Sequence, residues 1–332
     1  MFFWEKCIIA FIVAAVSAWL LGLIIIPLLK RVKARQIILG YVDNHAGKSG
    51  TSTMGGVIFA LAALFSYLIL SKTKGILSII SLVIAFAYLI VGFLDDFIKI
   101  KNHKNAGLTA LQKIFFQAAI AFIVSIFVST RSFIDFFIPF FNIYLNLGVW
   151  GSILVFFIFI ATTNCVNLTD GLDGLAGGIS YVYLLLLASL IILQIYVYPE
   201  NYVLPGEVED LALLSIVQSG GLIGFLVYNT FSASVFMGDT GSLYLGGLIA
   251  SISIFSGNAF FIPLFGIMFV ISGISVIIQV WFYKRTKKRI FLMAPLHHHF
   301  EYQGHSESKI VFVYKLITLI VGLICIVITA GG

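Results

Sequence analysis

Residues 164–178 read NCVNLTDGLDGLAGG, a polar and glycine-rich stretch between two apolar runs, 149–161 and 179–197. The stretch holds two Asp, two Asn and four Gly. Such residues do not form a packing unit of a core, because polar groups without partners are costly to bury. The pattern therefore predicts a polar loop that joins two membrane spans and lies at a membrane surface.

The rest of the chain is as apolar as these flanks. Of its 332 residues, 61% are hydrophobic and only 10% are charged, whereas ordinary soluble domains carry about 25% charged residues. Uncharged apolar runs of about 20 residues indicate spanning helices rather than buried core helices. The short alternating segments of a transmembrane barrel are not evident. We expect an all-α, polytopic integral membrane protein.

The hydropathy pattern fits about ten spans. Residues 1–332 are expected to form a single polytopic membrane domain. The first apolar run is interpreted as a span, because it is too long for a cleavable signal and no small-residue cleavage site follows it. The expected spans are 7–29, 54–71, 76–94, 112–130, 148–164, 175–197, 211–228, 241–256, 260–282 and 310–330.

The basic residues predict the orientation. Most Lys and Arg fall in the loops 30–53, 98–113 and 283–309. By the positive-inside rule these loops are cytoplasmic, which places both termini outside. The net charge of +6 then reflects membrane topology rather than nucleic-acid binding. The six His and the acids near span ends gather at the cytoplasmic face, where we expect the active site.

The chain has three scattered cysteines, which suggest neither a disulfide framework nor a zinc site. They are Cys7, Cys165 and Cys325.

Two acidic motifs stand at the ends of expected spans. In GFLDDFIK (92–99), the adjacent Asp95 and Asp96 are costly to bury unless a metal or cations pair with them. A hard cation such as Mg²⁺ binds carboxylate oxygens and substrate phosphates together. In FMGDTGS (236–242), Asp239 precedes a span whose free N–H groups attract phosphate. The purely structural alternatives are an interfacial acidic cap and an N-cap Asp.

Three further motifs offer polar chemistry. In DGLDG (170–174), Gly permits close backbone approach and Asp can bind a cation or a nucleoside hydroxyl; the alternative is a helix-capping turn. The loop KSGTSTMGG (48–56) lacks the residue order of a P-loop, but its Gly, Ser, Thr and Lys residues are suited to phosphate binding. The alternative is a flexible basic loop. The three consecutive His of APLHHHFE (294–301) do not have the spacing of zinc ligands on a helix. They fit acid/base catalysis or hydrogen bonds to substrate; the alternative is a solvated loop.

Together these motifs resemble a known superfamily. The patterns GxxDDxxK (92–99), NxxNxxDGxDGLA (164–176) and MGDxGS (237–242) are similar to those of the polyprenyl-phosphate N-acetylhexosamine-1-phosphate transferases. The stretch MAPLHHHFE (293–301) resembles, more narrowly, the phospho-N-acetylmuramoyl-pentapeptide transferase family of bacteria, and TSTMGG (51–56) agrees with it.

The chain departs from the family pattern at three positions. Ser52 and Ser232 stand where Pro is usual, and Val227 replaces a frequent Trp. These changes affect loop geometry and remove no chemical group.

The resemblance implies an activity. It is the Mg²⁺-dependent transfer of phospho-MurNAc-pentapeptide from UDP-MurNAc-pentapeptide to undecaprenyl phosphate in the bacterial cytoplasmic (inner) membrane, the first membrane step of peptidoglycan synthesis. The products are undecaprenyl-diphospho-MurNAc-pentapeptide (lipid I) and UMP. A homodimer is a possible assembly of the chain. The alternatives are a sibling enzyme that moves GlcNAc-1-phosphate from UDP-GlcNAc, and a transporter with midplane carboxylates. Release of UMP separates an enzyme from a transporter.

The resemblance also implies catalytic roles. Asp239 would bind Mg²⁺, with Asp95 and Asp96 beside it. We expect a one-step displacement in which Asp95 positions or deprotonates the lipid phosphate. A two-step route through an aspartyl-phosphate stays open. The implied catalytic set is completed by Lys113, His297 and His298.

The remaining implied residues bind substrate. Phe236 would stack on uracil, Asp173 would serve the nucleoside side, and Asp170 would support the Mg²⁺ and diphosphate region. Asn164 and Asn167 are expected to hold the loop in place. The full substrate-binding set is Lys48, Thr53, Lys99, Asn167, Asp170, Gly171, Leu172, Asp173, Asn229 and Phe236.

Overall fold

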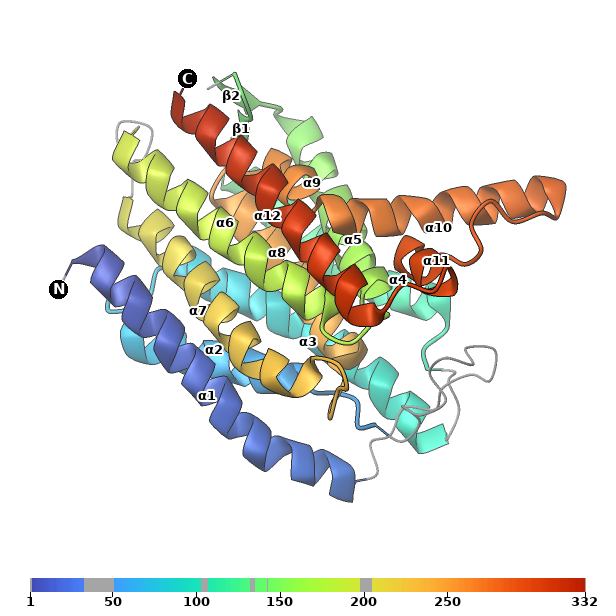
Figure 1. The fold of residues 1–332 in the computed structure, drawn as a ribbon. Coiled ribbons are helices and arrows are strands. Elements are labelled where there is room, and N and C mark those ends of the chain that lie inside the picture. The colour runs from blue at the N-terminus through green and yellow to red at the C-terminus, as the bar shows by residue number, and fades with distance from the viewer. Residues whose placement is uncertain are drawn as a thin grey trace.

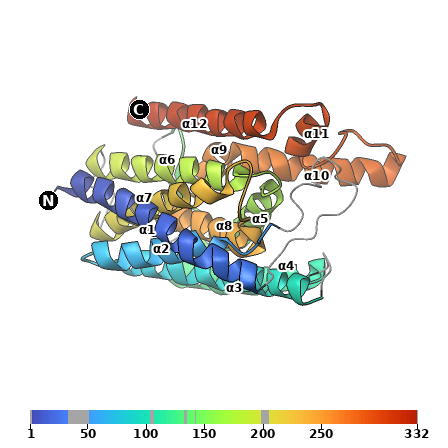
Figure 2. The same ribbon diagram turned by 60° about the horizontal axis from the view of Figure 1, so that its bottom comes forward.

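The computed structural model describes residues 2–32, 51–102, 107–131, 135–141, 143–197 and 205–331. Long helices dominate it, and most of them run side by side in one bundle (Figures 1 and 2). The helices are α1 (Phe3–Arg31), α2 (Gly56–Leu70), α3 (Ile76–Asn102), α4 (Ala110–Thr130), α5 (Val149–Thr169), α6 (Leu175–Val197), α7 (Pro205–Asn229), α8 (Gly238–Phe255), η3 (Ala259–Phe261), α9 (Ile262–Phe265), α10 (Ile267–Thr286), α11 (Leu296–Tyr302) and α12 (Glu307–Gly331).

Among the described residues, eight helices are long and apolar enough to cross a membrane. The expected polytopic membrane fold is therefore confirmed, although two of the expected spans differ from the rest. The span expected over 54–71 is α2, a helix of only 15 residues. The span expected over 241–256 is α8, in which every residue from Thr240 to Phe255 is buried. Because α8 is covered by other helices, it can carry many Gly and Ser residues.

The span expected over 260–282 is not one continuous helix. It is divided into η3, α9 and α10. Pro263 has no N–H with which to extend a preceding helix, and Gly266 ends α9. The far end of α10 then projects away from the bundle (Figure 1), leaving Ile277 and Trp281 exposed.

A short antiparallel hairpin was not expected from the sequence. Its strands are β1 (Asp135–Ile138) and β2 (Ile143–Asn146). Phe136 and Phe137 of β1 are buried, and their rings contact Phe260 and Phe261. A four-residue strand is too short to stand out in a hydropathy profile.

Small residues let the central helices approach closely, as is common in membrane proteins. α1 buries Ala10, Ala14 and Ala18 at a spacing of four residues. A Cβ at Gly224 of α7 would overlap the backbone of Ala15. The N- and C-terminal ends lie at the same end of the bundle (Figure 2). The side of the membrane that they face stays a prediction.

Candidate active site

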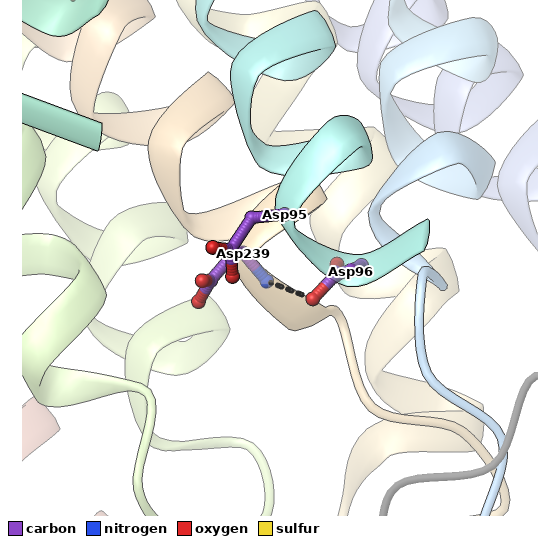
Figure 3. A group of neighbouring side chains, drawn as sticks. All are labelled: Asp95, Asp96 and Asp239. Atoms are coloured by element: carbon purple, nitrogen blue, oxygen red, sulfur yellow. Dashed lines mark hydrogen bonds between the residues drawn. The ribbon is translucent and has the colours of Figure 1, made fainter. Parts of the chain in front are cut away.

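The end of α3 and the start of α8 bring three carboxylates together. Gly92 of α3 packs so closely on α8 that a Cβ there would overlap the carbonyl group of Asp239. Asp239 therefore lies beside Asp95 and Asp96 (Figure 3). One oxygen from each of these three carboxylates lies within 4.8 Å of the others. This arrangement of hard oxygen atoms suits a cation such as Mg²⁺.

The two adjacent acids of α3 have different partners. Asp96 accepts hydrogen bonds at Oδ2 from the N–H (3.0 Å) and the hydroxyl (2.7 Å) of Thr240, and at Oδ1 from the N–H of Asp239 (3.3 Å; Figure 3). It thus satisfies the free N–H groups at the start of α8. Asp95 accepts the N–H of Leu108 at 2.8 Å through Oδ1 and leaves Oδ2 to the charged groups of the cluster.

Two lysines complete this acid–lysine cluster, which we define as Asp95, Asp96, Asp239, Lys99 and Lys113. The Lys99 Nζ lies 2.5 Å from Asp95 Oδ2 and 2.9 Å from Asp239 Oδ2. Lys113 of α4 forms an ion pair with the same Asp239 oxygen, and its Nζ lies 3.7 Å from Asp95 Oδ2. Three acids and two bases leave one formal negative charge.

α5 supports the cluster from a third side. The Asn167 amide donates hydrogen bonds to Asp239 Oδ1 at 2.7 Å and to the Ser242 hydroxyl at 2.8 Å. One turn earlier, the Asn164 amide donates to Gln117 Oε1 at 2.7 Å. Gln117 is fully buried on α4, one turn after Lys113. The hydrogen bond between Asn164 and Gln117 therefore holds α5 and α4, and with them Asn167 and Lys113, in register.

The loop 170–174 lies next to this cluster. Burial raises the pKa of the Asp170 carboxyl well above its usual range, and the negative charges of Asp239, Asp96 and Asp173 add to the effect. Asp170 thus interacts electrostatically with the acids of the cluster and with its own loop. A role for Asp170 in the cation and diphosphate region stays a prediction.

Asp173 joins the loop to two other segments. Its Oδ2 accepts the N–H of Ala233 at 3.0 Å, and its own N–H donates to Glu307 at 3.3 Å. Leu172 is buried beside it. The loop is thereby fixed to the segment after α7 and to the start of α12.

His297 and His298 of α11 face the same loop. A Cβ at Gly171 would overlap the ring of His297 and would stand 2.9 Å from His298 Nε2. His298 Nδ1 lies 2.9 Å from Glu301 Oε2. His297 is fully buried, and within the described residues neither of its ring nitrogens has a hydrogen-bond partner. Burial, with the nearby His298, lowers the pKa of His297 to about 3, so its ring is neutral at pH 7.

The other expected substrate residues lie between these parts. A Cβ at Gly238 would meet both Thr53 and Asp96, so Thr53 borders the cluster. Phe236 is half-buried, and its N–H donates to the Ser52 carbonyl group at 2.8 Å. Asn229 is buried and donates to the Val235 carbonyl at 2.9 Å, while its Oδ1 has no partner among the described residues. Lys48 lies outside the described residues.

Several supporting residues were not predicted from the sequence. Thr240 and Ser242 belong to the motif around Asp239, so their place in the motif was the available signal. Gln117 and Glu307 carry no such signal, because neither belongs to one of the motifs. Their contacts depend on helix packing.

Comparison with known proteins identifies the family of the chain. The family model described as glycosyl transferase family 4 matches residues 78–257, more than half of the chain. The chain is similar to the phospho-N-acetylmuramoyl-pentapeptide-transferase of Clostridium botulinum, with 42% identity over 92% of this chain and 90% of the relative. It is 38% identical to those of Clostridioides difficile (96% and 95% covered) and Desulfitobacterium hafniense (99% and 99% covered). The chain therefore belongs to glycosyl transferase family 4 and, within it, to the phospho-N-acetylmuramoyl-pentapeptide transferases.

Proposed function

We propose that the chain transfers phospho-MurNAc-pentapeptide from UDP-MurNAc-pentapeptide to undecaprenyl phosphate, forming lipid I and UMP, and that the acid–lysine cluster is the site of transfer. The main support for this proposal is the convergence of four charged side chains from three helices at one end of the bundle. They are Asp95, Asp239, Lys99 and Lys113. The bacterial relatives and the multi-pass fold support a place in the bacterial cytoplasmic membrane.

Charge neutralisation is the main requirement of this reaction. A lipid phosphate and a nucleoside diphosphate are both anionic, so they repel one another unless cations lie between them. Lys99 and Lys113 supply two positive charges on flexible side chains. Because the acids already engage these charges, the cluster needs a further cation when substrates bind.

The carboxylates fit Mg²⁺ as that cation. The Lys99 Nζ lies 2.5 Å from Asp95 and 2.9 Å from Asp239 but 3.7 Å from Asp96, whose two oxygens accept hydrogen bonds at the start of α8. We therefore assign Mg²⁺ binding mainly to Asp239, with Asp95, and assign Asp96 to positioning Asp239. When bound, the ion would neutralise the diphosphate and polarise the bond that breaks.

The transfer is proposed to be a single displacement. Asp95 would position or deprotonate the lipid phosphate. One oxygen of that phosphate forms a bond to the phosphorus that carries MurNAc, while the bond from this phosphorus to the UMP oxygen breaks. Lys99 and Lys113 would hold the phosphates during this exchange.

The loop 170–174 and its neighbours are proposed to bind the nucleoside. Phe236 offers a half-buried ring for uracil, and Asn229 Oδ1 is a buried acceptor without a partner in the described part of the chain. A buried acceptor of this kind gains a hydrogen bond when a ligand donor reaches it. His297, being neutral, is suited to hydrogen bonding rather than to charge neutralisation.

The lipid chain requires an apolar surface near the cluster. α10 packs on α5, the helix that carries Asn167, and exposes Ile277 and Trp281 where it projects from the bundle (Figure 1). We assign the undecaprenyl chain to this side of the molecule.

The proposed reaction can be tested by the release of UMP. Purified protein with UDP-MurNAc-pentapeptide, undecaprenyl phosphate and Mg²⁺ should release UMP, and UDP-GlcNAc should not replace the donor. Asp239→Asn should lower the rate by roughly 100-fold or more, because it removes a charge that acts at the transferred phosphate. UMP release can be followed by chromatography. Wild-type turnover by Asp239→Asn at saturating Mg²⁺ would remove Asp239 from its role.

Asp96 should contribute to stability through its hydrogen bonds to the start of α8. Asp96→Asn weakens the cap of α8, which typically stabilises a helix by about 0.5–2 kcal/mol. It should lower the thermal unfolding midpoint in detergent. Thr240→Val should also lower the unfolding midpoint. The double variant should be destabilised by less than the sum of the two single variants, because both changes break the same interaction. An unchanged midpoint for Asp96→Asn would instead favour a direct role in metal binding.

The lowered pKa of His297 should make the free energy of unfolding depend on pH. Its native pKa of about 3 lies below the unfolded value near 6.5, so only the unfolded state takes up a proton between these values. The contribution of neutral His297 to the free energy of unfolding is therefore fully present above pH 6.5. Below pH 6.5 it decreases as the pH falls, by up to about 1.4 kcal/mol per pH unit. His297→Gln should flatten the decline of the unfolding midpoint between pH 7 and pH 5. His305→Gln, at an exposed position, is the control; equal slopes in the two variants would contradict the assignment.

A further inference from the structure

An apolar groove lies between α2 and α3, away from the candidate active site. Its volume is about 510 Å³, and every lining residue is apolar. Leu64 and Leu68 line it from α2, and Leu82, Val83 and Phe86 from α3. Both helices pack on α7 and α8, which leaves their outer faces separated. Val83 is 63% exposed, so the groove opens outward, toward the bilayer of a membrane-embedded protein.

A turn carrying two lysines joins α2 to α3 at one end of this groove. α2 ends at Leu70, and the turn that leads to α3 exposes Lys72 and Lys74. Asp210 of α7 holds the turn in place, since its Oδ2 accepts hydrogen bonds from the hydroxyls of Ser71 (2.9 Å) and Thr73 (2.5 Å). The lysines are thus presented outward by a fixed backbone.

The acids near this turn are already engaged. Asp210 also accepts the N–H of Gly75 at 2.7 Å and lies 3.9 Å from the Lys6 Nζ. Glu207 accepts the N–H of Leu77 at 3.1 Å. Among the described residues, neither Lys72 nor Lys74 has an ion-pair partner, so both charges are available to a ligand.

The length of α2 sets the depth of these charges. Its 15 residues span about 22 Å, less than the roughly 30 Å of a bilayer's hydrocarbon core. Because α2 starts near the acid–lysine cluster, the turn at its other end lies near the boundary of the hydrocarbon core. Lysines at that depth extend their ammonium groups to the level of lipid phosphates.

We propose that the α2–α3 groove and the lysine turn form a binding site for an anionic phospholipid. One acyl chain lies along Leu68 and Val83, and the phosphate contacts Lys72 and Lys74. An acyl chain matches a groove without polar lining, and the two lysines attract an anionic head group. A second copy of the chain fits less well, because a twofold contact about the membrane normal would bring the lysine turns of both copies together.

Native mass spectrometry of the detergent-released protein tests this site. Phosphatidylglycerol should bind more tightly than phosphatidylcholine with the same acyl chains. Lys72→Gln with Lys74→Gln should weaken phosphatidylglycerol binding about fivefold or more and leave phosphatidylcholine unchanged. Val83→Trp should fill the groove and weaken both lipids.

Matched variants serve as controls. Lys284→Gln with Lys288→Gln removes the same charge at the far end of α10, and Ile69→Trp adds the same ring to an exposed position of α2 outside the groove lining. Neither should change lipid binding. UMP release by every variant checks folding and keeps this test separate from the proposed reaction. Equal binding of the two lipids by the wild type would overturn the proposal. So would a Val83→Trp variant that loses a dimer but keeps its lipid.

Discussion

The close contact between α3 and α8 determines the candidate active site. Gly92 leaves room for the backbone of Asp239, and Gly238, with a φ of +70°, leaves room for Asp96 and Thr53. A side chain at either position would push the two helices apart. Asp96 then caps α8 and fixes the orientation of Asp239 toward Asp95. The charged groups are therefore placed by backbone packing, and their mutual attraction alone does not explain the arrangement.

This packing explains how so apolar a chain keeps a charged cluster. Three carboxylates at the end of α3 and the start of α8 would be costly without partners. Lys99, Lys113 and Asn167 supply those partners from three helices, and Gln117 with Asn164 sets two of the helices in register. The same groups are the ones that a phosphoryl transfer needs. Stability and chemistry thus depend on one set of side chains, which incoming phosphates and a cation would rearrange.

The sequence predicted the parts of the site that lie within compact motifs. Asp95 and Lys99, one turn apart on a helix, and Asp239 in its glycine motif were identified and do meet. The different partners of Asp95 and Asp96 were not predictable, because both stand at the same helix end and only the approach of α8 separates them. Hydropathy located the long helices, but it missed the hairpin at Phe136 and the break at Gly266. These features arise from short segments and tertiary contacts that an average over many residues does not resolve.

Asp239, positioned by α8, is proposed to bind a divalent cation. Mn²⁺ binding to the detergent-solubilised protein, followed by electron paramagnetic resonance and competition with Mg²⁺, tests it without relying on turnover. We expect one saturable Mn²⁺ site that Mg²⁺ displaces, that Asp239→Asn abolishes and that Asp96→Asn weakens only modestly. Unaltered Mn²⁺ binding by Asp239→Asn would contradict it.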